Sequence, residues 1–403
     1  MSKTIRYKLK PSGPFHIGGS GIGIEKTWDI IHSDTLFSAI VSAWRSLGEK
    51  IDSNGNMELL TPFFSEPGNP PFKLSSAFPY SKDVLLFPAP MIKTSSDKKE
   101  RKAQFVSSKV LRSTKIEGSV PKQSGKVYVS KEERLLFNIS QDLQGIQDNL
   151  NKKIVSEMLR QEFKNNEITL TQNSVTSVET ADNTWCIKDK QQAYIIIKKE
   201  EKLNVYEDHI PSVIWKSGYD AIVPRVTIDR ISSASAIYHC GELVFSDDCG
   251  LYFWVELIDE SYEQHLSKAM EFLSEEGIGG ERSIGCGRFS YTDPESVSLP
   301  TANDANLYMT MSLYHPTCNE VKNGILDESA YELVTRRGWL RSPDGGAQRR
   351  KSVKMLAEGS VFSQPSFVGD IPDVRPKGWD HHPIYDYGLA FILPIRWEVS
   401  QVG

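Results

Sequence analysis

The sequence predicts an α+β fold of two ferredoxin-like (RRM-like) domains, each a βαββαβ unit, with a large insertion in the first. Strand-like and helix-like segments alternate in the same order near both ends of residues 1–300. Residues from about 60 to 245 separate these two halves and are too many for a plain connection, so we interpret them as inserted structure. The remaining residues, 301–403, begin and end with strand-like segments and predict a smaller second domain.

The first half of the N-terminal domain is predicted to be a strand, a glycine-rich turn and a helix. Polar and apolar residues alternate in TIRYKLK (residues 4–10), and the turn PSGPFHIGGSGIGIE follows. Apolar residues recur at helical spacing in SDTLFSAIVSAW (residues 33–44), which predicts a helix with one buried face. Ser33 and Asp34 are both suitable N-caps, because each can accept a hydrogen bond from a backbone N–H of the first turn.

The second half of this domain repeats the strand and helix order. LYFWVELI (residues 251–258) predicts a buried strand, and SYEQHLSKAMEFLSEEG (residues 261–277) predicts an amphipathic helix that ends at Gly277. The segment CGRFSYT (residues 286–292) predicts a further strand.

Between that helix and that strand lies GIGGERSIGCGRF (residues 277–289), which contains five glycines and two arginines. Missing side chains let backbone N–H groups approach a phosphate closely, and Arg282 and Arg288 add positive charge. We therefore expect a phosphate-binding loop. The loop lacks the sequence of a nucleotide triphosphatase loop and precedes a strand, unlike a dinucleotide-binding loop. A flexible connection that uses glycine only for its backbone conformations is the alternative.

Two clusters hold most of the local positive charge. Residues 336–354 carry seven Lys or Arg against one acid, within a predicted hairpin whose turn is Asp344-Gly345-Gly346. Trp339 could stack on an unpaired base there while neighbouring arginines such as Arg337 neutralise phosphates. Residues 93–126, which include Arg112, carry ten Lys or Arg against three acids. This first cluster is either a solvated face or a salt-sensitive RNA contact.

Composition sets limits on function. The formal net charge of −5 argues against a uniformly basic nucleic-acid coat, so a polyanion must be met by local patches. No stretch of 18 apolar residues occurs, and the N-terminus lacks a signal-peptide core, so we expect a cytoplasmic protein without membrane contact. The five cysteines form no CxxC pair and are expected to be unreactive thiols.

Several segments together resemble the RAMP superfamily of CRISPR proteins, and within it the Cas5-like fourth subunits of type III-A Csm effector complexes. The matching segments are HIGGSG at 16–21, HSDTLFSAI at 32–40, AFPY at 77–80, the loop at 277–289, and GSVFSQPSFVGDIPDVRP at 359–376. The resemblance implies that both predicted domains are of the RAMP type.

It also implies a non-catalytic role without cofactor or metal. Such a subunit binds the 5′ repeat-derived handle of the CRISPR RNA, lies beside target RNA, and contacts the large polymerase-cyclase subunit and an adjacent RAMP backbone subunit. A hairpin thumb that wedges into the guide and target duplex is expected too, and the basic insertion after Met91 is our candidate for it. The expected RNA-binding residues, from the resemblance and the charge clusters together, are Gly18, Gly19, Ser33, Arg112, Gly279, Gly280, Arg282, Ser283, Gly285, Arg288, Arg337 and Trp339.

Other functions stay open on sequence grounds. A CRISPR RNA processing ribonuclease of the same superfamily would use His16 or His32 as general base. A target-cutting RAMP subunit would use Asp29 or Asp34, although Asp34 at the start of a helix has a simpler role in stabilising the fold. A metal site could involve adjacent Asp380, His381 and His382, but no further ligand spacing supports it. A stand-alone single-stranded RNA-binding protein would need the same basic patches.

Overall fold

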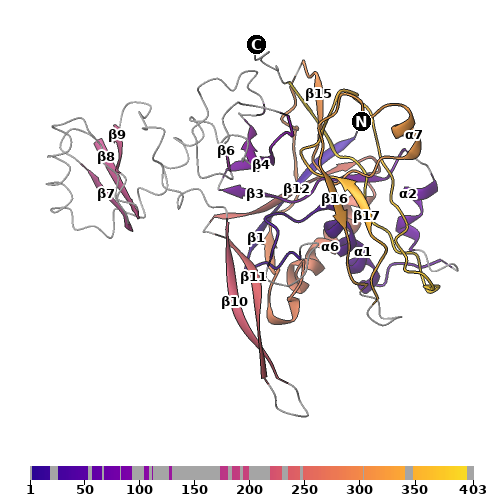
Figure 1. Ribbon diagram of the computed structural model, residues 1–403, viewed down its shortest axis with the longest axis horizontal. Helices are drawn as coiled ribbons and strands as arrows, with labels where there is room; N and C mark the ends of the chain where they lie inside the picture. Colours follow the sequence, from indigo (N-terminus) through magenta and orange to yellow (C-terminus); the bar gives the residue numbers. More distant parts are fainter. Residues whose placement is uncertain are drawn as a thin grey trace. The chain divides into compact units, whose positions relative to one another are not determined.

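The computed structural model of the chain forms two compact units (Figure 1). The first unit comprises residues 1–80, 87–92 and 217–398, and the second comprises 81–86, 93–216 and 399–403. The structure describes residues 2–18, 26–52, 57–65, 68–81, 83–92, 104–108, 111, 127–128, 173–179, 184–190, 194–198, 218–228, 235–245, 248–302, 304–340 and 348–396.

The central sheet of the first unit is antiparallel around two long strands. β1 (Lys3–Pro11) pairs with β12 (Cys249–Leu257) from Lys3↔Leu257 to Leu9↔Leu251. The strand order is β13-β1-β12-β3, in which β13 is Phe289–Tyr291 and β3 is Phe78–Ser81. β14 (Glu295–Ser296) also pairs with β1, and β2 (Phe72–Leu74) pairs with β12.

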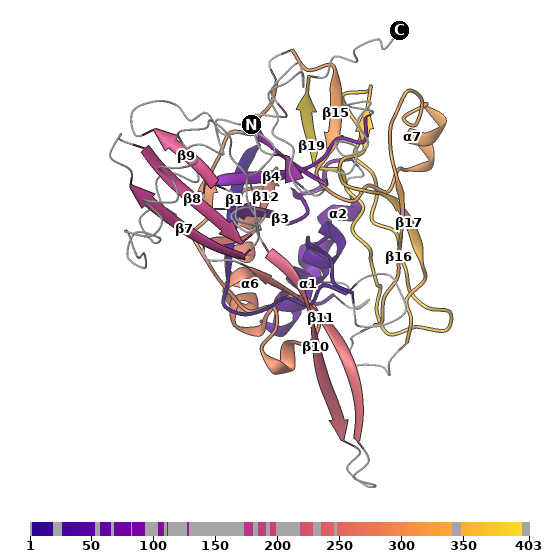
Figure 2. The same ribbon diagram turned by 60° about the vertical axis from the view of Figure 1, so that its left-hand side comes forward.

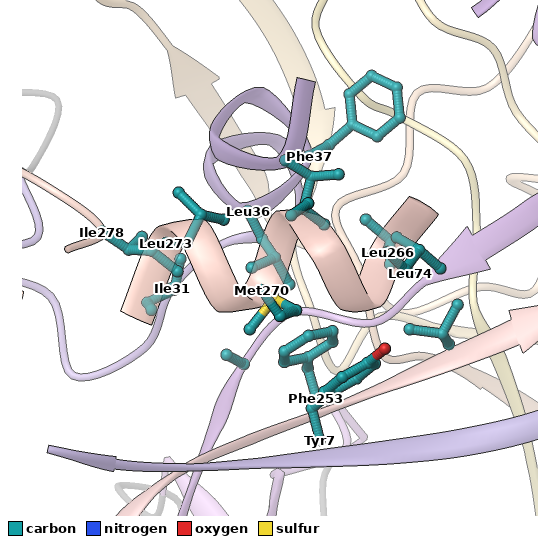
Figure 3. Close-up of a cluster of buried hydrophobic side chains, with 14 of the residues drawn as sticks. Tyr7, Ile31, Leu36, Phe37, Leu74, Phe253, Leu266, Met270, Leu273 and Ile278 are labelled. Carbon is teal, nitrogen blue, oxygen red and sulfur yellow. The ribbon is translucent and has the colours of Figure 1, made fainter. Parts of the chain in front are cut away.

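Two helices pack on one face of this sheet, α1 (Ser33–Ser46) and α6 (Tyr262–Glu276), as Figure 3 shows. Strand residues alternate between faces, so Tyr7 and Phe253 point towards the helices and stack with their ring centroids 5.0 Å apart. Leu36 and Met270 come from the helices into the same cluster. Both helices are therefore held by burial of one apolar face, as their sequence periodicity predicts.

The opposite face of β12 is buried as well. Trp254 packs against Phe87 and Phe391, with ring centroids 5.5 and 6.0 Å away. Burial on both faces explains why this strand is a continuous apolar run rather than an alternating one.

A long hairpin extends from the rest of the first unit (Figures 1 and 2). It consists of β10 (Gly218–Ile228) and β11 (Ser235–Phe245), which pair in regular antiparallel register. Ile222, Val226 and Ile237 on its surface are 65%, 55% and 71% exposed. This hairpin lies within the predicted insertion, where the sequence analysis had identified no element.

The C-terminal part belongs to the first unit. β15 (Leu307–Thr310) lies between β18 (Val361–Phe362) and β19 (Ile392–Ile395) in an antiparallel sheet. A second hairpin, β16 (Leu333–Arg336) with β17 (Val353–Leu356), confirms the hairpin predicted there, although its turn lies outside the described residues. The short elements of the unit are η1 (Glu58–Leu60), α2 (Pro62–Ser65), η3 (Arg282–Ile284) and α7 (Cys318–Lys322).

The second unit contains a parallel pair, β5 (Phe105–Ser107) with β6 (Val127–Tyr128), and a three-stranded antiparallel sheet. That sheet is formed by β7 (Asn173–Glu179), β8 (Thr184–Lys190) and β9 (Tyr194–Lys198), while β4 (Val84–Pro88) crosses the boundary between the units. Arg112 and most of the first basic cluster, including its start after Met91, lie outside the described residues.

The described residues thus form a mixed α/β fold with mostly antiparallel sheets. None of the helices within those ranges has both the length and the apolar character that crossing a bilayer would require.

Candidate RNA interface

The glycine-rich loop, residues 277–289, begins where α6 ends. Gly277 has a φ of 82° and donates its N–H to the Leu273 carbonyl at 2.8 Å, which closes the last helical turn. Glu281 and Gly285 then adopt left-handed φ angles of 54° and 92° on either side of the 3₁₀ turn η3. The loop therefore reverses direction twice within a few residues.

Backbone hydrogen bonds join this loop to the turn after the first strand. The Gly280 N–H donates to the His16 carbonyl at 2.8 Å, and the Gly287 N–H donates to the Pro14 carbonyl at 2.8 Å. The Ser12 N–H donates to the Arg288 carbonyl at 2.9 Å. The two loops thus lie together over the described part of that turn, which includes Gly18 but not Gly19.

Close packing explains most of the glycines in the loop. A Cβ atom on Gly279, whose φ is 102°, would lie 2.5 Å from the His16 carbonyl oxygen, and one on Gly280 would lie 2.6 Å from the His16 ring. A Cβ on Gly287 would lie 2.1 Å from the Ile278 carbonyl oxygen. Gly18 and Gly285 differ, because a Cβ there would meet no atom within 4 Å. Gly279 and Gly280 are therefore required for contact with the first turn, whatever the loop binds.

The outer surface of the loop carries the groups that a phosphate needs. Ser283 and Arg288 are exposed and Arg282 is half-buried. Among the described residues, the backbone N–H groups of Glu281, Arg282 and Ser283 have no hydrogen-bond acceptor. Adjacent N–H groups beside arginine side chains are a typical arrangement for anion binding.

The inner side of the loop is packed with polar groups that already have partners. His16 is 6% exposed, and its Nδ1 donates to the Gly241 carbonyl at 2.7 Å. Glu242 is buried and forms an ion pair with Arg225. Burial raises the pKa of the neighbouring Cys240 and Cys286 thiols, which keeps them protonated at neutral pH.

The start of α1 is also buried, which corrects two expectations about Ser33. Ser33 is 0% exposed, and its hydroxyl accepts a hydrogen bond from the Leu313 N–H at 3.0 Å, so it does not lie on a surface that could face RNA. The N-cap position is His32, one residue before the predicted caps, and no side chain caps the helix there.

Asp34 forms a buried ion pair with the C-terminal hairpin. Its two oxygens accept hydrogen bonds from Arg336 Nε at 2.7 Å and Arg336 Nη2 at 2.9 Å. Burial alone would raise the pKa of Asp34, but the charge and hydrogen bonds of Arg336 outweigh it and lower the pKa to about 2. Asp34 thus joins α1 to a residue 302 positions later, and the guanidinium occupies both carboxylate oxygens.

Arg350, from the other arm of the hairpin, points into the same buried cluster. It pairs with Asp386 and lies 3.6 Å from Asp34. Beside it, His32 Nδ1 lies 2.8 Å from Glu358, which also accepts a hydrogen bond from Ser76. Two of the seven basic residues in the cluster at 336–354, Arg336 and Arg350, are therefore neutralised inside the fold.

The outer face of the same hairpin is exposed. Trp339 is 60% exposed, and the Arg349 guanidinium lies 4.9 Å above the centre of its ring. Trp339 and Arg349 face each other across the hairpin, and Arg337 is exposed next to them. Sequence alternation along each arm separates these side chains from Arg336 and Arg350.

The remaining candidates are not assembled into a reactive site. The Trp379 ring packs against the imidazoles of His381 and His382, and Asp380 is exposed. Within the described ranges, no three His, Cys, Asp or Glu side chains are placed to hold a metal ion.

Comparisons with known proteins match the whole chain. The RAMP superfamily model matches residues 8–290, and a model of the CRISPR Csm4 C-terminal domain matches residues 303–395. The CRISPR system Cms protein Csm4 of Methanocaldococcus jannaschii is 22% identical over 431 residues, which cover 100% of both chains. The protein of the same name from Thermococcus onnurineus is 25% identical, with 98% of each chain covered.

A solved structure shares the fold. A chain in the crystal structure of the Csm3-Csm4 subcomplex of the type III-A CRISPR-Cas interference complex superposes with a TM-score of 0.50 at 19% identity. The superposition covers 98% of this chain and 99% of that one.

Proposed function

The chain belongs to the RAMP superfamily, and we propose that it is the subunit of a type III-A Csm effector complex that binds the 5′ handle of the CRISPR RNA. The observation that carries this proposal is the hydrogen-bonded pair formed by the glycine-rich loop and the first turn, with Arg282 and Arg288 on its outer side. Backbone N–H groups and arginines can bind phosphates and so fix the position of an RNA strand without reading its bases. Ser283, Gly18 and Gly285 lie on the same proposed RNA surface.

The strand order supports a ferredoxin-like domain as the carrier of this site. β1, α1, β3, β12, α6 and β13 follow one another in the chain as a βαββαβ unit, with spatial order β13-β1-β12-β3. In that arrangement the turn after the first strand and the turn after the second helix meet at one edge of the sheet. We propose a second, smaller domain of this type at 301–403 and an insertion in the first at about 60–245.

The related crystal structure is that of a Csm3-Csm4 subcomplex, which supports an adjacent RAMP backbone subunit as a partner. We propose as further partners the large polymerase-cyclase subunit and, through the guide, target RNA, all within the cytoplasm. For the thumb we propose the hairpin β10–β11, because its exposed apolar side chains, such as Ile237, suit contact with bases. Our earlier candidate after Met91 lies outside the described residues.

We also propose that the subunit has no catalytic activity of its own. Three of the four candidate acids and bases are engaged: Asp34 by Arg336, His32 by Glu358, and His16 by the Gly241 carbonyl. Purified protein should leave repeat RNA and target RNA intact with or without divalent metal. Cleavage that disappears in His16→Ala or His32→Ala would overturn this part of the proposal.

The test of handle binding is RNA retention by the reconstituted effector complex. Arg282→Glu places negative charge beside phosphate and should weaken RNA binding by about 1.5–3 kcal/mol, the value of a charged hydrogen bond. Lys377→Glu is the matched control, since Lys377 is exposed and lies outside the loop. Full RNA retention by Arg282→Glu, with an unchanged melting temperature, would contradict the proposal. RNA bound without sequence preference by the chain alone, and no complex formed, would favour a stand-alone RNA-binding protein.

A further inference from the structure

The β16–β17 hairpin has two faces with different chemistry. On the inner face, Arg336 and Arg350 form ion pairs with Asp34 and Asp386. Gly338 leaves room for this arrangement, because a Cβ there would lie 2.9 Å from Arg350 Nε. The inner face therefore fixes the hairpin to the rest of the first unit.

The outer face makes no comparable contribution to the fold. Trp339 is 60% exposed, against 36% for Trp28. Tryptophan brings a large apolar area, so leaving it in water gains little for folding. The Arg349 guanidinium lies 4.9 Å from the centre of this ring, on one of its two faces.

The charge around the ring selects the kind of ligand. Arg337 and Lys354 are exposed on the same hairpin, and residues 333–340 and 348–356 contain no Asp or Glu. Tryptophan and arginine are common in protein interfaces too, but lysine is depleted there, and aromatic rings among cations are typical of single-strand binding. A paired base cannot offer its face, so the ligand must be unpaired.

We propose that Trp339, backed by Arg349, is a stacking platform for one unpaired nucleobase, and that Arg337 contacts a phosphate of the same strand. The inference rests on the proposed function only in taking the strand to be RNA. It places a contact with single-stranded RNA on the C-terminal hairpin, in addition to the handle contact of the glycine-rich loop.

The test uses the full chain and a short fluorescent oligouridylate, which lacks the handle sequence. Trp339→Ala should lower the affinity at least about 5-fold, the lower end expected for loss of one base stack. Trp339→Phe should keep most of the affinity because it retains a ring, while Trp339→Leu should not. Tyr331→Ala is the matched control, since Tyr331 is a 41% exposed aromatic residue just before the same hairpin and should leave the affinity unchanged.

Two further arms identify the contact. Photocrosslinking of an iodouridine-substituted strand should give an adduct at Trp339 by mass spectrometry. The equivalent oligodeoxythymidylate should show the same dependence on Trp339, because stacking does not read the 2′-hydroxyl. If the affinity depends on Trp339 for the oligouridylate but not for the oligodeoxythymidylate, the sugar is recognised rather than the base face. That result would overturn the proposed stacking platform.

The inference fails if the parent chain does not bind the oligouridylate, if Trp339→Ala binds it as tightly as the parent, or if Trp339→Leu retains the parent's affinity. Loss of subunit assembly in Trp339→Ala with unchanged oligouridylate binding would instead assign the ring to a protein partner. These outcomes are separate from the proposed function. If Arg282→Glu releases CRISPR RNA while Trp339→Ala changes nothing, handle binding stands and the platform falls.

Discussion

The two arginine-bearing segments, the glycine-rich loop at 277–289 and the β16–β17 hairpin, use their positive charge in different ways. Arg288 in the loop is exposed, whereas Arg336 in the hairpin is 4% exposed and bound to a buried carboxylate. The glycines differ as well. Those of the loop allow the first turn to pack closely, whereas Gly338 leaves space for the Arg350 side chain. Local charge density thus overstates the charge available to RNA wherever a distant acid neutralises part of it.

The largest expected effect is on stability and separates the two kinds of arginine. Asp34→Ala would leave Arg336 buried without its partner, which should lower the free energy of unfolding by about 3–5 kcal/mol. Arg288→Ala, at an exposed position, should change it by less than about 0.5 kcal/mol. Urea denaturation of both variants measures the difference. Equal losses would show that the distinction between inner and outer arginines is wrong.

A smaller effect is expected within the loop. Gly279→Ala should lower the free energy of unfolding by about 1–3 kcal/mol, because the new Cβ would collide with the His16 carbonyl. Gly18→Ala is the control, since its Cβ meets nothing within 4 Å and its φ is not in the left-handed region. Thermal melting that ranks Gly18→Ala as the more damaging change would refute the packing explanation.

The hairpin cluster should make stability depend on pH in a way that the loop does not. Burial and the negative charge of Asp34 raise the pKa of Asp386 to about 6 from an ordinary 3.8. Between these values the folded chain holds a proton that the unfolded chain has lost, so stability should fall as pH rises through this window. The contribution of Asp34, whose pKa is lowered to about 2, acts in the opposite sense and is lost as pH falls below 3.8.

Asp386→Asn should remove the fall between pH 4 and 6, which is at most about 1.4 kcal/mol for each pH unit. Asp380→Asn, at an exposed position, should preserve it. The measurement is the free energy of unfolding as a function of pH across this range. If its slope is the same in Asp386→Asn as in the parent, another group is responsible for the pH dependence.

The smallest effect is expected at the outer face of the hairpin. Trp339→Ala should change the free energy of unfolding by no more than about 0.5 kcal/mol, because the ring is 60% exposed. A sharp drop in melting temperature would show that the ring belongs to the core and would remove the contrast between the two faces.

Local patterns predicted the elements that carry the loop. The helix expected at 33–44 is α1 (Ser33–Ser46), and the one expected at 261–277 is α6 (Tyr262–Glu276). Both succeed because one apolar face repeats at helical spacing and is buried. The hairpin was found from its turn residues and two periodic arms.

Other features depend on contacts that no local pattern contains. Arg336 and its partner Asp34 lie 302 residues apart in the sequence. Glycine is needed at position 279 because the His16 carbonyl of the first turn packs against it. Adjacent residues on one strand, such as Arg336 and Arg337, point to opposite faces of the hairpin. Nothing in the sequence said which face an acid would meet. The β10–β11 hairpin was not predicted. Its apolar residues are exposed, and the sequence alone does not show whether an apolar residue in a strand is buried or exposed.

The most direct test of the central claim is hydrogen exchange of the loop amides in the reconstituted effector complex, with and without CRISPR RNA. The account predicts that the amides of Glu281, Arg282 and Ser283 exchange more slowly when RNA is present, because phosphate oxygens become their acceptors. The Gly280 amide, which already donates to His16, should change little. Unchanged exchange at all three amides on RNA binding would contradict the assignment of this loop to the handle.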